Sequence, residues 1–484
     1  MQAYKLQRTA GNTGSRFMNV TIIGTGYVGL VTAACLAEVG NTVICVDKDA
    51  KKIAQLTAGE LPFYEPELSE LVRRGVHDGR ISFTCDLADS VSNAHVVFIA
   101  IGTPATQDGH ANVDDIFDCA ARLQKILVTD VVLAIKSTVP VGTCEQIQTV
   151  FDRSHATIAV VSNPEFLAEG RAIQDFRMPE RIVIGGKSRT AHDLLKRLYG
   201  PFDPDGTRLL WMDIRSAEFS KYACNAMLAA RISMINELAC IAGQVDADIL
   251  SVCKVLSTDS RIGPHYMRPG AGYGGSCLPK DLRALIGLAQ EHNEPAQLLR
   301  SVESVNARQG QLILQSLTDH FAGLLEDKCI AVWGLSFKPG TDDLRAAPSL
   351  TLIDALLAAG ATVQAYDPVA MNAAKKLIKD SRLTLMPSAE SACVGADALV
   401  VMTEWEQFKN PDLAFLARSL STGAVFDGRH LYRSEVLATH QLLHYRLGSK
   451  AAVTATPSKG SNKDAKYFRK EGDKRPATLS AAPW

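Results

Sequence analysis

Short apolar runs alternate with helical-length segments along most of the chain. From Met18, the run Val20–Ile23 precedes a glycine turn and a segment of small residues, and Thr42–Val46 follows as a second apolar run. Runs of the same kind recur at 95–101, 131–135, 158–161 and 181–184. Strands that alternate with helices are typical of a parallel, doubly wound α/β sheet.

The pattern changes near residue 213. Residues 214–246 contain few helix breakers and many Ala, Leu, Met and Ile residues, which predicts one long helix. Further helical segments run to about residue 318, around a Gly/Pro-rich loop at 263–279. A second α/β block begins at Cys329 and continues with a helix over 348–359 and strands at 361–367, 398–402 and 424–427. The predicted fold is therefore two Rossmann-like doubly wound α/β domains joined by a long central helix and a helical connector.

This pattern divides the chain into five expected segments. They are a flexible extension at 1–17, a Rossmann domain at 18–212, a helical domain at 213–318, a Rossmann-like domain at 319–448 and a basic tail at 449–484. Residues 450–484 hold six Lys, two Arg and three acidic residues with few aliphatic ones, a composition typical of disorder. The acid-free leader fits a flexible extension before a start at Met18 better than a transit peptide.

Composition narrows the functional classes. The 484 residues are 46% hydrophobic and 21% charged, with a net charge of −1, so no basic excess points to a nucleic-acid binder. No run approaches 18 consecutive apolar residues, so we expect no membrane span. The eleven cysteines are scattered without a C-x-x-C pair. That spacing argues against a zinc site and favours a reducing, cytoplasmic location.

The turn at 24–29, with the sequence GTGYVG, has the pattern G-x-G-x-x-G between a predicted strand and a predicted helix. Gly24 would permit the tight turn, Gly26 would let a pyrophosphate approach the backbone, and Gly29 would let the helix pack on the sheet. The helix N-terminus would offer free N–H groups to the phosphates. The alternative is a ligand-free turn, which the context makes the weaker interpretation.

Asp47 ends the second predicted strand, about 20 residues after the glycine turn. Its carboxylate would accept hydrogen bonds from ribose hydroxyls and repel a 2′-phosphate, which favours NAD over NADP. Lys48 and Lys52 lie close enough in sequence to weaken that preference.

The loop 272–281, GYGGSCLPKD, places Cys277 after several small residues and four positions before Asp281. A lone cysteine is usually a small buried hydrophobe. Glycines that let a ligand approach, together with a nearby carboxylate, favour a reactive thiol instead. Asp281 is expected on the first turn of a helix.

Two other pairs have spacings that suit a site. Lys221 and Asn225 are spaced i, i+4 and share one face of the long helix, although a solvent-facing pair is the simpler interpretation. Glu165 and Glu169 follow a buried strand four residues apart. Paired carboxylates there would suit general-base chemistry or water positioning, whereas a solvated face is the ordinary alternative.

Seven motifs occur in one order along the chain. They are GTGYVG (24–29), IGTP (101–104), STVPVGT (137–143), NPEFLAEGRAIQDF (163–176), KYACNA (221–226), GYGGSCLPKD (272–281) and GLSFKPGTDDLR (334–345). With this set the chain resembles the nucleotide-sugar dehydrogenases over about residues 18–447, nearest the branch that acts on UDP-glucose. Leu278 departs from that branch, which commonly has Phe there, and is also seen in enzymes acting on GDP-mannose.

The resemblance implies an NAD-dependent, four-electron oxidation of a sugar CH₂OH group to a carboxylate. The alternative is a GDP-mannose or UDP-N-acetylmannosamine 6-dehydrogenase with the same chemistry. A binding protein without turnover and a two-electron hydroxyacid dehydrogenase are rival classes. The intact set of Cys277, Lys221, Asn225, Asp281 and Glu169 argues against the first, and Cys277 argues against the second. We expect no metal, and a homodimer or larger homo-oligomer built on the long helix.

The family's functional residues carry over to matching positions. The catalytic set is Cys277 as the nucleophile that forms a thiohemiacetal and then a thioester, Lys221 and Asn225 as oxyanion stabilisers, Asp281 in proton transfer, and Thr138 and Glu169 as holders of the water. The cofactor set is Gly24, Gly26, Tyr27, Val28, Gly29, Asp47, Lys52, Thr103, Thr138, Glu169 and Arg345. The substrate set is Glu165, Phe166, Leu167, Lys221, Asn225, Arg261 from a neighbouring subunit, Tyr266, Gly272, Tyr273, Gly274, Cys277, Lys338 and Arg429.

Overall fold

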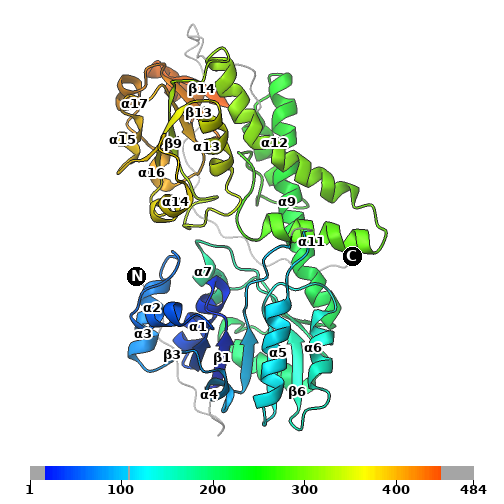
Figure 1. Ribbon diagram of the computed structural model, residues 1–484. Coiled ribbons are helices and arrows are strands. Elements are labelled where there is room, and N and C mark those ends of the chain that lie inside the picture. The colour runs from blue at the N-terminus through cyan, green and yellow to red at the C-terminus, as the bar shows by residue number, and fades with distance from the viewer. Residues whose placement is uncertain (1–16, 107–108, 448–484) are drawn as a thin grey trace, which may run out of the picture.

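The computed structural model describes residues 17–106 and 109–447. The predictions for residues 1–16 and for the basic tail therefore lie outside the described residues. Figure 1 shows two sheet domains, one built from the N-terminal part of the chain and one from the C-terminal part, with long helices running beside both. The predicted fold class is confirmed.

The first sheet has the strand order β3-β2-β1-β4-β5-β6-β7-β8 within the described residues. Its strands are β1 (Asn19–Ile23), β2 (Thr42–Val46), β3 (Ile81–Thr84), β4 (Val96–Ile99), β5 (Val131–Ile135), β6 (Ile158–Ser162), β7 (Ile182–Gly185) and β8 (Leu209–Met212). Its helices are α1 (Tyr27–Glu38), α2 (Ala50–Thr57), α3 (Leu68–His77), α4 (Leu87–Val91), α5 (Asp114–Ile126), α6 (Thr143–Phe151), α7 (Ala172–Arg177) and α8 (Arg189–Tyr199), followed by the 3-10 turn η1 (Gly200–Phe202).

Two features of this sheet differ from the sequence prediction. One strand pair departs from the predicted parallel arrangement, because β7 runs antiparallel to β6, where Ser162 pairs with Gly185. The edge strands β3 and β8 were not predicted. Both have partly exposed side chains, so neither shows the continuous apolar run of a strand covered on two faces.

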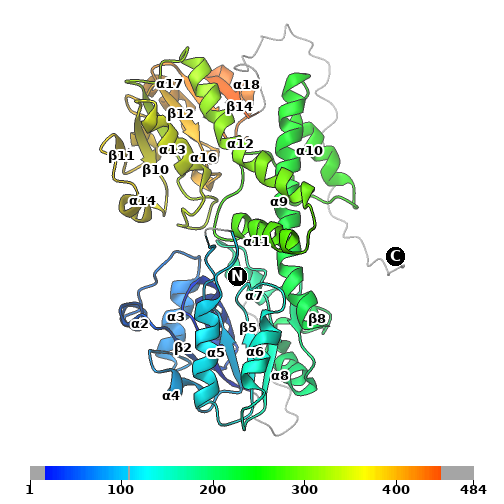
Figure 2. The same cartoon turned by 45° about the vertical axis from the view of Figure 1, so that its right-hand side comes forward.

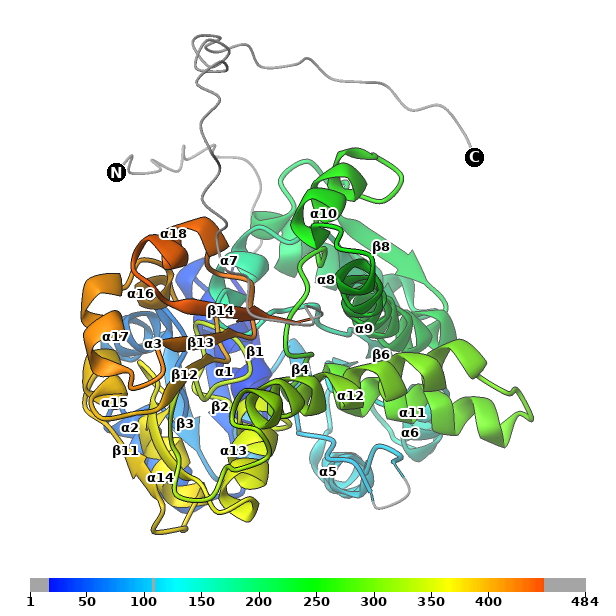
Figure 3. The same cartoon turned by 90° about the horizontal axis from the view of Figure 1, so that it is seen from above.

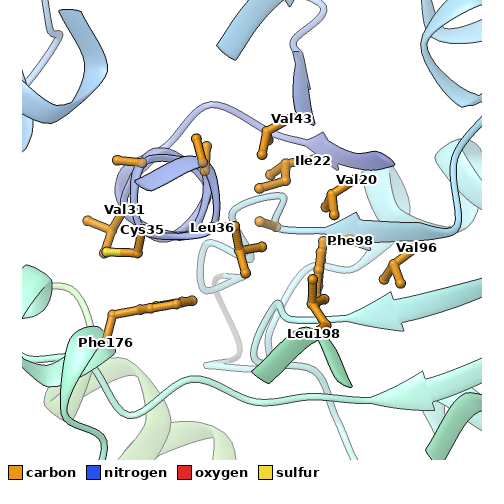
Figure 4. Close-up of a cluster of buried hydrophobic side chains, with 14 of the residues drawn as sticks. Val20, Ile22, Val31, Cys35, Leu36, Val43, Val96, Phe98, Phe176 and Leu198 are labelled. Carbon is orange, nitrogen blue, oxygen red and sulfur yellow. The ribbon is translucent and has the colours of Figure 1, made fainter. Parts of the chain in front are cut away.

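Strand β4 shows why the central strands appear in the sequence as uninterrupted apolar runs. Val96 and Phe98 pack in a core cluster on one face of the sheet, whereas Val97 and Ile99 pack in a second cluster on the other face. Successive side chains of a strand point to opposite faces, so a strand covered on both faces is apolar throughout. Figure 4 shows the first cluster, where Phe98 lies among side chains from α1, α7 and neighbouring strands.

The central helices join the two domains. They are α9 (Ile214–Gln244), α10 (Ile249–Thr258), α11 (Leu278–Glu291) and α12 (Gln297–His320). Figure 2 shows α9 extending alongside both domains, with α10 beside its upper part. The long-helix prediction is therefore confirmed, with its end at residue 244 instead of 246.

Glu218 anchors α9 to the first domain. Its buried carboxylate accepts hydrogen bonds from the backbone N–H groups of Gly142 (2.6 Å) and Cys144 (2.8 Å) at the start of α6. The N-cap of α6 has no side-chain hydrogen bond of its own, so Glu218 satisfies N–H groups that α6 leaves open.

Helix α9 is long and apolar enough to cross a membrane by length and composition alone, and it alone meets that test among the described residues. It also carries the buried polar side chains of Glu218, Lys221 and Asn225 and packs against α11 and α12. Part of its surface is therefore covered inside the protein, while Phe219, Met227, Met234 and Ile241 leave apolar side chains exposed.

The second sheet has the order β11-β10-β9-β12-β13-β14 in the part of the chain that the structure describes. Its strands are β9 (Cys329–Trp333), β10 (Thr362–Tyr366), β11 (Leu383–Leu385), β12 (Ala398–Val401), β13 (Ala424–Asp427) and β14 (Leu443–Arg446). Its helices are α13 (Pro348–Ala358), α14 (Met371–Leu377), α15 (Ala389–Cys393), α16 (Glu406–Lys409), α17 (Leu413–Ser419) and α18 (Ser434–Thr439). The short strands β11 and β14 lie at the edges and were not predicted. Figure 3 shows α12 passing beside this sheet toward α9 and α11.

The two domains touch through a pair of glycines. A Cβ on Gly170 would lie 3.0 Å from the Cα of Gly340, and both residues have positive φ, +83° and +81°. Only glycine satisfies both the close backbone approach and the left-handed conformation. This contact brings the loop that follows β6 against the loop that follows β9.

Candidate active site

A cavity of about 560 Å³ lies between the domains, against α9 and α11. Its lining comes from the loop after β6, one face of α9, one face of α10, the glycine-rich loop before α11 and the loops after β9, β12 and β13. It gathers most of the predicted catalytic and substrate residues, namely Leu167, Glu169, Lys221, Asn225, Tyr266, Gly272, Tyr273, Gly274, Cys277, Lys338 and Arg429.

Lys221 forms a buried ion pair at one side of this cavity. Its Nζ lies 2.9 Å from Oε1 of Glu165, and the two side chains are only 4% and 7% exposed. Burial alone would lower the pKa of Lys221, but the charges of Glu165, Cys277 and Asp281 outweigh it and raise the pKa to about 12. Lys221 is therefore an ammonium ion held inside the protein, and the solvent-facing interpretation is wrong.

Glu165 and Glu169 do not act as the carboxylate pair that their spacing suggested. Glu165 turns to Lys221, and with Phe166 it lines an adjoining cavity of about 550 Å³. Glu169 turns toward the second domain, where its Oε2 accepts a hydrogen bond from Thr341 Oγ1 at 3.0 Å. Neither carboxylate lies on a solvated face, because Glu165 is buried and Glu169 is half-buried.

Asp281 links α11 to α9. It lies on the first turn of α11, as predicted, and its carboxylate is 1% exposed. It accepts hydrogen bonds from Asn225 Nδ2 at 2.6 Å and from Lys280 Nζ at 2.6 Å. The predicted shared face of Lys221 and Asn225 is confirmed, since both side chains reach the cavity.

Cys277 is the N-cap residue of α11 and is half-buried at the cavity wall. Its Sγ lies 3.4 Å from Ser276 Oγ. Burial raises the pKa of the thiol, while the ammonium of Lys221 opposes that rise. A sulfur at a helix N-terminus, near a buried cation and at a cavity wall, has the surroundings of a reactive cysteine.

Glu169 faces Cys277 through Ser276. Ser276 Oγ lies 3.3 Å from Oε1 of Glu169, and Arg345 Nη2 lies 3.7 Å from the same oxygen. Burial and the charge of Asp343 raise the pKa of Glu169 to about 7. A carboxyl group with this pKa exchanges a proton readily at neutral pH.

The glycine turn fits a dinucleotide. An added Cβ on Gly29 would lie 1.9 Å from the carbonyl oxygen of Gly24, so the turn and α1 pack without room for a side chain. A Cβ on Gly26 would meet nothing within 4 Å, and α1 has no side-chain cap. Open space in front of uncapped N–H groups is the environment that a pyrophosphate requires.

Asp47 lies beside that turn at the end of β2. Its Oδ2 accepts hydrogen bonds from Thr25 N–H (3.0 Å) and Thr25 Oγ1 (2.7 Å), and Lys52 Nζ lies 2.8 Å from the same oxygen. Burial would raise the pKa of Asp47, but these partners lower it to about 2. Lys48 points away and pairs with Asp115 at 2.8 Å. Asp47 is thus fully ionised, which suits a ribose diol.

The other predicted cofactor residues surround the same end of the first sheet. Thr103 follows β4 and donates a hydrogen bond to the carbonyl of Thr138, which follows β5, at 2.8 Å. Tyr27 begins α1 and donates from its hydroxyl to Glu65. Val28 packs against the core cluster under α1.

Two arginines of the predicted site, Arg261 and Arg345, line neither of the two cavities. Arg261 is 86% exposed, pairs with Asp259 at 2.6 Å, and lines neither cavity, so this chain does not bring it to its own site. Arg345 pairs with Asp343 at 2.7 Å at the edge of the domain contact.

Sequence reasoning missed several buried groups. Lys136 is 4% exposed, and its Nζ lies 3.3 Å from Asn163 Oδ1 and 3.5 Å from Tyr199 OH, beside the cavity that Glu165 lines. Glu65 is 4% exposed and bonds Tyr27. A single charged residue beside an apolar run carries no signal in one sequence, because its partners come from distant segments. Among the described residues, no group of three or more His, Cys, Asp and Glu side chains could hold a metal ion.

Comparison with known proteins identifies the three parts of the chain. Residues 18–203 match the NAD binding domain of the UDP-glucose/GDP-mannose dehydrogenase family, residues 215–308 its central domain and residues 331–434 its UDP binding domain. The chain is similar to UDP-glucose 6-dehydrogenases from Pseudomonas aeruginosa (45% identity over 89% of this chain and 97% of the relative) and Rhizobium meliloti (40%, 89% and 99%).

A solved structure similar to this chain belongs to a protein of the same kind. A UDP-glucose dehydrogenase from Pyrobaculum islandicum superposes with a TM-score of 0.84 at 31% identity, covering 91% of this chain and all of that one. The matches extend across both sheets and the central helices. The chain therefore belongs to the UDP-glucose/GDP-mannose dehydrogenase family, and its first sheet forms the NAD-binding domain of an oxidoreductase of that family.

Proposed function

We propose that the protein oxidises the C6 hydroxymethyl group of UDP-glucose to a carboxylate, giving UDP-glucuronate. The observation that carries the proposal is one cavity that holds Cys277, Lys221, Asn225 and Glu169 together. The cysteine distinguishes a four-electron oxidation from a two-electron one, which has no need of a covalent intermediate. Relatives with 40% and 45% identity bear the name UDP-glucose 6-dehydrogenase and favour UDP-glucose over GDP-mannose.

Lys221 and Asn225 act in the first oxidation. The C6 hydroxyl loses its proton with the participation of Asp281, and the buried ammonium of Lys221 stabilises the developing alkoxide, assisted by Asn225. NAD, when bound, supplies the hydride acceptor, and each of the two oxidations would consume one NAD. A preorganised donor inside a closed site commonly contributes about 100- to 1,000-fold in rate.

Cys277 then retains the aldehyde. Its sulfur attacks the C6 carbonyl and forms a thiohemiacetal, whose oxyanion is again stabilised by Lys221. Loss of a second hydride from C6 gives a thioester on Cys277. The covalent bond keeps the aldehyde from leaving between the two oxidations.

In the last step, Glu169 and Thr138 hold the water that attacks the thioester. Glu169, with its pKa near 7, takes a proton from the water that attacks the thioester. The products are the uronate and the free thiol of Cys277. Lys338 and Arg429, in the loops after β9 and β13, hold the diphosphate and sugar from the second domain.

The same proposal assigns roles to three of the predicted segments. Residues 18–212 bind NAD, residues 213–318 form the subunit contact and residues 319–448 bind the UDP-sugar. A cytoplasmic location is supported by eleven free cysteines, a state that a reducing compartment maintains. The net charge of −1 gives no sign of a nucleic-acid partner.

The stoichiometry of NAD reduction tests the function directly. We expect two NADH for each UDP-glucose consumed, with no free aldehyde accumulating, because the thioester route passes through both oxidations before release. NADH absorbance measured against chromatographic loss of UDP-glucose gives the ratio. A ratio of one would restore the two-electron interpretation, and faster turnover of GDP-mannose in the same assay would favour the alternative substrate.

Cofactor preference follows from Asp47. We expect kcat/KM for NAD to exceed that for NADP by about 100-fold or more, because a 2′-phosphate would face a fully ionised carboxylate. Asp47→Ala should reduce the difference in kcat/KM between NAD and NADP. The variant removes the repelling carboxylate and leaves Lys52 without its partner. Lys48→Ala is the matched control and should leave the preference unchanged, because Lys48 pairs with Asp115 instead. Equal use of both cofactors by the wild type would show that Lys52 overrides Asp47.

A homodimer, or a larger assembly containing it, is supported by an exposed apolar stripe on α9. Phe219, Met227, Met234 and Ile241 recur at intervals of seven or eight residues and are 46%, 64%, 58% and 55% exposed. A stripe of this kind marks an interaction surface. We expect Met234→Asp with Ile241→Asp to shift the sedimentation mass to that of a monomer. If the partner donates Arg261, the monomer also loses activity; a wild-type monomer would contradict the proposal.

A further inference from the structure

Glu65 is a buried carboxylate with three donors around it. Its Oε2 accepts hydrogen bonds from the Tyr27 hydroxyl and from the backbone N–H of Gly170 (2.6 Å), and its Oε1 accepts from the N–H of Ala172 (2.8 Å). Every partner is a donor, so the group functions as an acceptor, which an ionised carboxylate suits.

The three donors come from segments that serve different parts of the site. Tyr27 belongs to the glycine turn of the first domain, whereas Gly170 and Ala172 lie one and three residues after Glu169. Gly170 is also the glycine that touches Gly340 of the second domain. Glu65 therefore joins the cofactor turn to the loop that carries Glu169, at the point where the two domains meet.

The backbone after Glu169 depends on this anchor. Gly170 has a φ of +83°, a conformation that glycine adopts freely, so the chain has little intrinsic preference for it. The neighbouring residue Tyr64 donates its N–H to Asp342 Oδ1 of the second domain at 3.0 Å. The segment around Glu65 thus restrains the Glu169 loop from both domains.

We propose that Glu65 is a positioning residue for thioester hydrolysis, because it fixes the loop that aims Glu169 at Cys277. This inference rests on the proposed function. Glu65 touches neither substrate nor cofactor in this scheme and acts only through the loop. The two oxidations depend on Lys221 and Cys277, whose positions are set by α9 and α11, so they should depend less on Glu65 than hydrolysis does.

Glu65→Gln is the sharpest variant. The carboxamide places an NH₂ group against at least one of the three donors, so it loses a charge-assisted hydrogen bond and adds a repulsive contact. We expect steady-state kcat to fall by about tenfold or more, with a rapid burst of about two NADH per active site before slow turnover. Intact-protein mass spectrometry during turnover should show the uronyl thioester. Glu65→Asp, which keeps the charge, should recover part of the rate.

Asp203→Asn controls for a loss of folding alone. Asp203 likewise accepts backbone N–H bonds, from Thr207, Arg208 and Leu209, and lines neither cavity. We expect it to lower Tm without a burst or an accumulated thioester. Equal slowing of the burst and of steady-state turnover by Glu65→Gln would overturn the positioning role.

A second measurement separates this inference from the proposed function. Hydrogen–deuterium exchange of the peptide containing Gly170 and Ala172 should be faster in Glu65→Gln than in the wild type, whatever the reaction. Unchanged exchange would overturn the inference even if the wild type forms two NADH. A wild-type ratio of one NADH per UDP-glucose would instead contradict the proposed function. The exchange measurement would still show whether Glu65 restrains the loop.

Discussion

Cys277→Ser should lower steady-state turnover by about 1,000-fold or more, while still permitting the two hydride transfers of a single turnover. A serine oxygen can capture the aldehyde as a hemiacetal in place of sulfur, and a second hydride transfer to NAD then gives an oxygen ester. That ester hydrolyses far more slowly than a thioester. Label from the substrate should therefore stay attached to the protein. Mass spectrometry after incubation with NAD and UDP-glucose locates the added mass on the peptide that contains residue 277.

Cys85→Ser is the matched control for this variant. Cys85 is an exposed cysteine and lines neither cavity near the site. Its replacement should leave both the rate and the absence of trapped product unchanged. Turnover by Cys277→Ser within about tenfold of the wild type would remove the thiol from the mechanism, since that difference is far below the loss of a covalent nucleophile.

Lys221→Ala should slow both oxidations by about 100-fold or more and trap nothing. The variant removes the ammonium that stabilises each oxyanion. It also removes the charge that opposes the burial-raised pKa of Cys277, so the thiolate becomes scarcer at neutral pH. Because the pKa of Lys221 is about 12, the wild type should show no loss of activity from its deprotonation between pH 6 and 9.

Glu165 provides the control for stability in this prediction. Lys221→Ala leaves the buried carboxylate of Glu165 without its counter-charge. Removing one partner of a buried ion pair lowers the free energy of unfolding by about 3–5 kcal/mol. Adding Glu165→Gln should recover much of the lost Tm without restoring the rate. Recovery of both together would show that the single variant fails through misfolding and would contradict the oxyanion role.

Much of the cofactor site follows from local sequence alone. The turn at 24–29 specifies its own geometry, since Gly29 has no room for a Cβ against Gly24. The central strands are covered on both faces, so they appear as uninterrupted apolar runs that need no tertiary information to be recognised. The helix at 214–244 and the position of Asp281 on the first turn of α11 were likewise predictable from spacing.

Other features were predictable only by resemblance to a family. The motifs of Cys277, Lys221 and Glu169 lie in three segments of the chain, and composition cannot say that they share a cavity. The edge strands β3, β8, β11 and β14 escaped detection because half-exposed short strands lack an apolar run. The antiparallel pairing of β7 also depends on how the chain returns after α7, not on the residues of β7 itself.

The sequence by itself therefore determined the fold class, the dinucleotide turn and which residues can do chemistry, because those properties reside in periodicity and in glycine's conformational freedom. Only the tertiary structure decided which groups pair with the buried charged side chains. Glu165 neutralises Lys221 instead of pairing with Glu169, and Glu65 collects donors from two distant segments. The physical reason is that a buried charge is stable only where folding places its counter-charge or its donors, and those groups come from residues far away in the chain.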